Sequence, residues 1–308
     1  MQNTFTHELD YRQERDFGQK ISAVFSFVQA QGRPLSRVLL YLVLPAALLS
    51  GMLMGIGQMG LFSTLDQTVA SRVARSGGPF GMLGTGFSFL AGMGGLLLTY
   101  LLLTATLYEY IRLRMTLPAE EEVTPALVWA QVRSSVWWLL LSGVVLGVLA
   151  ALGFLFLFFP GVYLVVALSP FFAVMIMERN GFSKNFSRCF ELVSGYWWAT
   201  FGLLFVMQLI QGFAGFIFQI PTYLLMGLKM AHIPVPGEGI LIVAAQTFGA
   251  IGQSLLYSLT LLAILFQYFN LVEIKEGVGM RHLVDSIGQQ PTAPVSSTAY
   301  RPDEEGEY

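Results

Sequence analysis

The side chains suited to acid–base or metal chemistry are few in this sequence and far apart. The histidines (His7, His232 and His282) are too scattered for a typical zinc or di-iron site. Four carboxylates border apolar runs, and all fall at the expected helix ends: Asp66, Glu109, Glu178 and Glu273. Charged groups inside a bilayer are costly, so a catalytic set at depth would stand out. The pattern predicts a non-catalytic protein with no cofactor and no metal.

Neutral amides are the polar groups that do lie within apolar runs. They are grouped near one face of each of the last two runs: Gln208, Gln211 and Gln219, then Gln246, Gln253 and Gln267. Amides can hydrogen-bond between membrane helices at roughly 0.6–2 kcal/mol each. They can also line a polar path for a solute, and the sequence leaves both uses open.

The elements that must position these groups are apolar helices. The chain has 308 residues, of which 55% are hydrophobic and 12% charged, against about 25% charged in soluble domains. Six runs approach the length of about 20 residues that a crossing needs: 38–60, 80–107, 136–158, 162–177, 197–228 and 240–271. We expect an all-α polytopic membrane protein with six transmembrane helices. A formal net charge of −2 argues against nucleic-acid binding, so the expected partners are lipids and other membrane proteins.

The fourth run is the unusual one. Residues 162–177 would reach only ~24 Å as a helix, against ~30 Å for the hydrocarbon core. Ser169-Pro170 interrupts the run further, because proline removes a helical hydrogen bond. Such a segment is either a transporter's binding element or a short helix packed against its neighbours.

The distribution of basic residues predicts the orientation. With six crossings and an inner N-terminus, all but Arg72, Arg75 and Lys229 of the 17 Lys and Arg residues fall on the inner side. The positive-inside rule therefore favours cytoplasmic termini at both ends.

Two amphipathic segments share one pattern. Apolar residues at Phe17, Ile21, Val24, Phe25 and Val28 recur with identical offsets at Phe182, Phe186, Cys189, Phe190 and Val193. Each segment predicts a helix on the membrane surface, followed by two crossings. We interpret this as a repeat of units 17–112 and 182–271 within a membrane domain of residues 17–285. Residues 1–16 would form a loose polar leader, and residues 286–308 a disordered acidic tail.

Three further patterns concern packing and the membrane boundary. Gly51-x-x-x-Gly55 predicts close helix packing. Aromatic residues near the expected inner boundary predict a belt: Tyr108, Tyr110, Trp137, Trp138, Tyr196, Trp197, Trp198 and Tyr268. The single cysteine, Cys189, is either a buried thiol or an acylation site.

A set of short motifs carries a family resemblance. The residues are Pro160, Gly161, Tyr163, Glu178, Gly181, Arg188, Gly195 and Trp197. Together they resemble the membrane domain joined to some bacterial glycerophosphodiester phosphodiesterases and related polytopic proteins. The resemblance implies a bacterial inner-membrane location and six helices, and it supplies no catalytic residue. A phosphodiesterase domain is not present in this sequence.

Read physically, the same motifs predict local structure. Pro160-Gly161 favours a tight outer hairpin between the third and fourth crossings. Glu178 would end the fourth crossing, Ser183 would cap the next helix, and Arg188 would face anionic headgroups. The leading hypothesis is a non-catalytic inner-membrane protein that supports or scaffolds a membrane process. The alternative is a transporter or lipid-handling protein that uses the glutamine faces.

Overall fold

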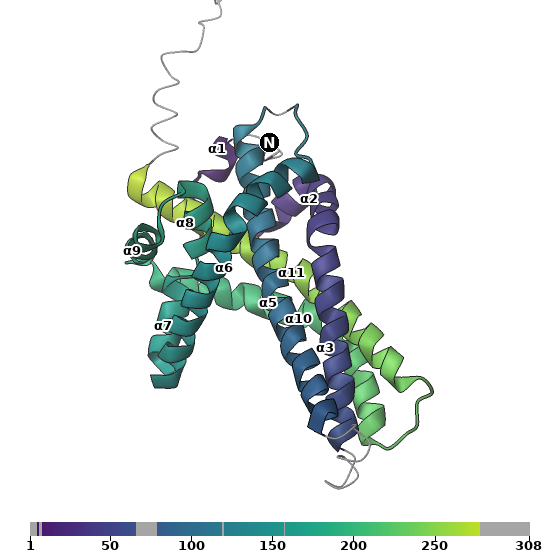
Figure 1. Cartoon of the computed structure of the whole chain (residues 1–308). Coiled ribbons are helices and arrows are strands. Elements are labelled where there is room, and N and C mark those ends of the chain that lie inside the picture. Colours follow the sequence, from purple (N-terminus) through teal and green to yellow (C-terminus); the bar gives the residue numbers. More distant parts are fainter. Residues whose placement is uncertain (1–4, 6–7, 66–78, 119, 157, 278–308) are drawn as a thin grey trace, which may run out of the picture.

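The computed structural model describes residues 5, 8–65, 79–118, 120–156 and 158–277, and in these residues it is helical, without strands. The helices are shown in Figure 1: α1 (Glu8–Tyr11), α2 (Phe17–Leu42), α3 (Leu44–Leu65), α5 (Pro79–Thr116), α6 (Pro125–Phe156), α7 (Phe158–Ala167), α8 (Phe171–Glu178), α9 (Phe182–Val193), α10 (Trp197–Met230) and α11 (Glu238–Glu276). The predicted tail and most of the first predicted outer loop lie outside the described residues.

Several helices are long and apolar enough to cross a membrane. Five spans meet this condition in the described chain: Gly86–Thr116, Pro125–Leu155, Phe158–Glu178, Trp197–Met230 and Glu238–Glu276. A sixth is obtained if α2 and α3, which meet at an angle of 53°, are counted as one bent span. The chain therefore has the helices of a multi-pass membrane protein. Only the first predicted crossing lacks a matching straight span among these five.

The start of that first crossing was predicted wrongly. We expected the surface helix to end near Gln31 and a crossing to begin at Val38, but α2 is one helix across both positions and contains Pro34. The bend falls at Val43 instead, just before Pro45. Proline is tolerated in the first turn of a helix because the amide it lacks has no partner there. Pro45 therefore suits the beginning of α3.

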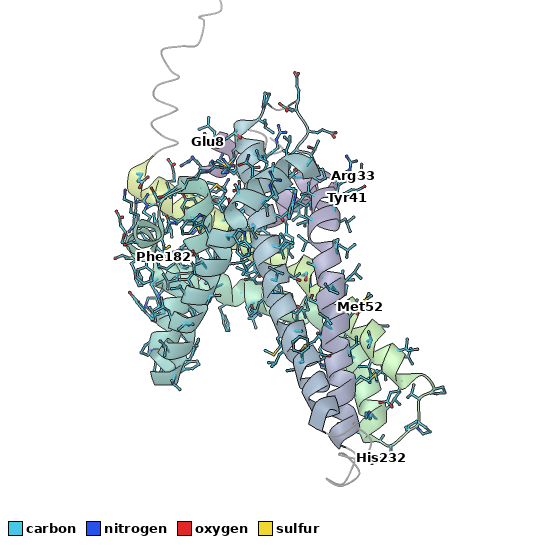
Figure 2. All side chains as sticks on the ribbon, viewed as in Figure 1. Glu8, Arg33, Tyr41, Met52, Phe182 and His232 are labelled. Atoms are coloured by element: carbon cyan, nitrogen blue, oxygen red, sulfur yellow. The ribbon has the colours of Figure 1, made fainter. Side chains whose placement is uncertain are left out.

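The helices form two arms joined at one end. In Figure 1, α6 and α7 descend together on one side, while α3, α5, α10 and α11 form the other arm. The closest packing within the second arm is of α3 on α5 and α11, and of α10 on α11. Figure 2 shows the exposed side chains of Met52 on α3, in that arm, and of Tyr41 at the end of α2.

Small residues allow the close approach in this arm. A Cβ atom on Gly55 would lie 2.7 Å from the Cα atom of Val243, and one on Gly51 would lie 2.8 Å from the Cα atom of Thr247. The prediction that Gly51 and Gly55 serve internal packing is therefore confirmed, and the partner helix is α11.

The end that joins the arms holds an aromatic core, which corrects two expectations. Tyr108, Tyr110 and Tyr268 are fully buried there and do not belong to a lipid-facing belt. The described part of the leader is also not loose. Tyr11 is fully buried, and its hydroxyl donates to the carbonyl of Phe5 at 2.8 Å. An aromatic side chain in a polar segment gains enough from burial to hold that segment against the core.

Candidate functional site

The family-like residues form a junction between α7, α8, α9 and α10. The rings of Tyr163 and Trp197 stack with centroids 5.9 Å apart, and the indole N–H of Trp197 donates to the Tyr163 carbonyl at 3.3 Å. The prediction put these residues at opposite ends of a crossing. They meet because α9 lies beside α7, with the ring centroids of Tyr163 and Phe190 6.5 Å apart, and so places the start of α10 next to α7.

Arg188 is the charged centre of this junction. Its guanidinium binds Glu178 at 3.2 Å, Glu191 at 3.4 Å and also Glu276. Tyr268 donates to the same Glu178 oxygen at 3.1 Å. Burial alone would lower the pKa of Arg188, but its hydrogen bonds with Glu276 and Glu178 more than offset this and raise the pKa. The expectation that Arg188 faces anionic headgroups is wrong, because carboxylates of α8, α9 and α11 occupy it.

The backbone roles expected for the other motif residues change as well. Pro160 and Gly161 lie within the first turns of α7 and not in a hairpin loop. A Cβ atom on Gly161 would lie 2.7 Å from the ring of Phe154, so this glycine permits close packing of α7 on α6. Glu178 does end α8, as predicted. The helix α9 begins after Gly181 and not at Ser183, and Gly195 has the positive φ (84°) that favours glycine.

Two of the glutamines bond α10 to α11. Gln211 accepts a hydrogen bond from Thr260 at 2.8 Å, and Gln267 donates to Thr200 at 2.9 Å. All four of these residues are buried. These bonds are those expected if the amides link neighbouring helices, the first of the two uses that the sequence left open.

Two other glutamines lie between the same helices, each opposite a glycine, and a third is buried on α11. Gln253 lies over Gly215, so that a Cβ atom there would be 2.4 Å from its side-chain nitrogen. Gln219 lies over Gly249 in the reciprocal arrangement, with 2.7 Å to its side-chain oxygen. Gln246 is 9% exposed. The glycines opposite Gln219 and Gln253 let the two helices close over these amides, which leaves little room for a solute beside them.

Gln208 differs from the other five because it faces a groove. The groove has a volume of about 550 Å³ and runs between α7 on one side and α5, α10 and α11 on the other. Its walls are mostly aliphatic and aromatic, and the start of α8 and the end of α6 close it. It therefore separates the two arms of the molecule (Figure 1).

Three polar side chains reach this groove with hydrogen-bonding capacity left over. They are the amide of Gln208 and the hydroxyls of Tyr100 and Tyr257, and none has a hydrogen-bond partner among the described residues. The two tyrosine rings meet edge to face, with centroids 4.9 Å apart. An apolar groove with a few converging polar groups is the usual form of a small-molecule site.

The sequence did not reveal Tyr100, Tyr257, Thr200 or Thr260 as site residues. The one available signal was position, because both tyrosines and Thr260 fall inside apolar runs and not at their ends. Which face each would present to a neighbour depends on helix rotation, and a single sequence does not provide it.

Cys189 is completely buried, as the buried-thiol alternative expected. Burial, with a smaller contribution from the negative charge of Glu178, raises its pKa to about 12. In the part of the chain described, no group of three His, Cys, Asp or Glu residues is placed to hold a metal ion.

These features define a multi-pass helical membrane protein with a groove between two helical arms. No family model, no curated protein and no solved structure matches this chain. The function is therefore argued from the site alone.

Proposed function

We propose that this protein is a non-catalytic lipid-handling protein of a bacterial inner membrane, and that the groove between its arms holds one amphipathic molecule. The observation that carries the proposal is the convergence of Gln208, Tyr100 and Tyr257 on an apolar groove with their hydrogen-bonding capacity unused. Apolar walls suit an acyl or isoprenoid chain. The amide and hydroxyls suit an ester, amide or hydroxyl group attached to that chain.

The cross-helix bonds support this choice over a path along the glutamine faces. The amide oxygen of Gln211 accepts from Thr260 and the amide nitrogen of Gln267 donates to Thr200, so both side chains are held between α10 and α11. Scaffolding, the leading expectation from the sequence, draws support from the same bonds, but any folded helical bundle shares them. The groove is the more specific feature, and it favours the lipid-handling alternative. The motif resemblance supports the bacterial inner membrane.

The test is native mass spectrometry of the protein extracted gently from its own membrane. Val165 lines the groove and is 44% exposed, so Val165→Trp fills the groove with little disturbance of the core. Leu209→Trp is the matched control, because Leu209 is 45% exposed on α10 and does not line the groove.

We expect the wild type and Leu209→Trp to retain a lipid-sized ligand, and Val165→Trp to lose it. Gln208→Leu should retain less ligand, by about tenfold, without a fall in stability, because it removes one hydrogen bond to the ligand and none within the protein. Equal retention by all four proteins, or a wild type that carries no ligand, would refute the proposal.

A further inference from the structure

A second cavity lies where α5, α6, α8 and the start of α9 meet. Its volume is about 340 Å³, and its lining includes Glu109, Ser134, Ser135, Trp138 and Arg179. Unlike the groove, it has charged side chains and several serine hydroxyls in its lining. It shares no lining residue with the groove.

The two charged residues that line this cavity, Glu109 and Arg179, differ in their partners. Glu109 is 1% exposed and is neutralised by Arg112, whose Nε lies 2.7 Å from the carboxylate. Arg179 has no carboxylate within 4 Å among the described residues. The nearby carboxylate of Glu178 is already bound by Arg188. Of the two charged lining residues, Glu109 is therefore paired and buried, whereas Arg179 is exposed and has no carboxylate partner in the described part of the chain.

Arg179 also has unused hydrogen-bond donors. Its guanidinium donates to the amide oxygen of Gln131 at 3.0 Å, and the same oxygen accepts from Arg112 at 3.2 Å. A guanidinium carries five N–H donors in a planar fork that matches the oxygens of a phosphate group. The cavity thus presents a partly satisfied phosphate-binding group beside Ser134 and Ser135.

The surroundings of the cavity indicate where the phosphate comes from. Trp138 borders the cavity and is 63% exposed, as expected of an indole at a membrane interface. Beyond it along α6, the apolar side chains of Leu141, Val144 and Val148 are 58%, 63% and 53% exposed. Acyl chains can lie along this face while the headgroup enters the cavity.

We propose that this cavity binds the phosphate of a glycerophospholipid, that Arg179 is its main ligand, and that the acyl chains lie along α6. The site is separate from the groove and does not depend on the function proposed for it. Inorganic phosphate has the same charged group without the chains, so the experiment must distinguish the two.

The experiment is a thermal-shift titration of the purified full chain in neutral detergent. The probes are dioctanoyl phosphatidylglycerol, dioctanoylglycerol with the same chains and no phosphate, and inorganic phosphate. Arg179→Gln removes the charge, and Arg179→Lys keeps it without the fork. Arg133→Gln is the matched control, because Arg133 is exposed on α6 and does not line the cavity.

We expect phosphatidylglycerol to stabilise the wild type and Arg133→Gln. It should bind Arg179→Gln with an apparent affinity at least about tenfold weaker than its affinity for the wild type. The apparent affinity of Arg179→Lys for phosphatidylglycerol should lie between those of the wild type and Arg179→Gln. Equal affinity of Arg179→Gln and the wild type would overturn the proposal, as would equal stabilisation by dioctanoylglycerol. Stabilisation by inorganic phosphate alone would overturn the lipid assignment. If phosphatidylglycerol no longer stabilised Val165→Trp, the lipid would lie in the groove and the second site would be overturned. Failure of the groove proposal by itself would not change the results expected here.

Discussion

At the scale of single residues, the chemistry of the chain lies in a few polar groups whose neighbours decide their roles. Gln208 and Gln211 are three residues apart on one helix and are chemically identical. One faces a groove and the other is bonded to Thr260. Arg179 and Arg188 differ in the same way, because Arg188 is bound by carboxylates and Arg179 lines a cavity. Residue type alone does not separate these roles.

The buried thiol gives a prediction that depends on pH. Because burial raises the pKa of Cys189 to about 12, the folded protein holds a neutral thiol at pH 8. Maleimide should label the folded protein at least about a hundredfold more slowly than the unfolded chain, since the thiolate is the reactive form. Cys189 is the only cysteine, so labelling reports on it alone.

The raised pKa of Cys189 also makes the stability of the protein depend on pH. An unfolded thiol ionises near pH 8.5, at about its unperturbed pKa, and the folded thiol does so only at about 12. The contribution to stability is therefore complete below about pH 8.5 and is lost progressively as the pH rises towards 12.

For the maleimide labelling, Ser187→Cys in a Cys189→Ala background is the control, because position 187 is exposed on the same helix. Equal labelling rates at the two positions would contradict the prediction.

At the scale of helices, the arm of α3, α5, α10 and α11 depends on contacts between backbones. Gly51 and Gly55 bring α3 against α11, while Gln219 and Gln253 are each covered by a glycine of the facing helix. In a bilayer, association of helices relies on packing and interhelical hydrogen bonds, because lipid chains are as apolar as the helices. Both sources are present in this one arm.

The glycine contact can be tested directly. Gly55→Ala places a Cβ atom 2.7 Å from the Cα atom of Val243, so α3 and α11 must separate. We expect a loss of about 1–3 kcal/mol in the free energy of unfolding, measured by titration with SDS in mixed micelles. Gly94→Ala is the control, since no atom lies within 4 Å of its Cβ position. It should be neutral or stabilising by up to about 1 kcal/mol, and an equal loss in both variants would contradict the packing role.

At the scale of the whole molecule, the two arms meet at an aromatic core and leave the groove between them. The short helices α7 and α8 are central to this shape, because they return the chain from α6 to the junction with α9 and α10. The sequence pattern marked this segment as short and broken by Pro170. Its tertiary contacts show that it forms one wall of the groove.

The predicted orientation also belongs to this scale. In a Cys189→Ala background, Lys184→Cys should be labelled only from the cytoplasmic side, and Pro236→Cys only from the opposite side, because positive charge is retained inside. Both positions are exposed in the structure, so each side chain is reachable. Labelling of intact cells and of inverted vesicles with an impermeant maleimide provides the measurement. Labelling of Lys184→Cys from outside would refute the orientation.

Sequence patterns alone predicted the helical class, the apolar spans after the first and the end of α8. These features depend on hydropathy and on spacing along one helix, which are local properties. Only the tertiary structure decided the bend at Val43, the contact of Tyr163 with Trp197, the carboxylates around Arg188 and the separate roles of the glutamines. Each of these depends on which face of one helix meets another, and that relation between distant segments is fixed by packing of the whole bundle.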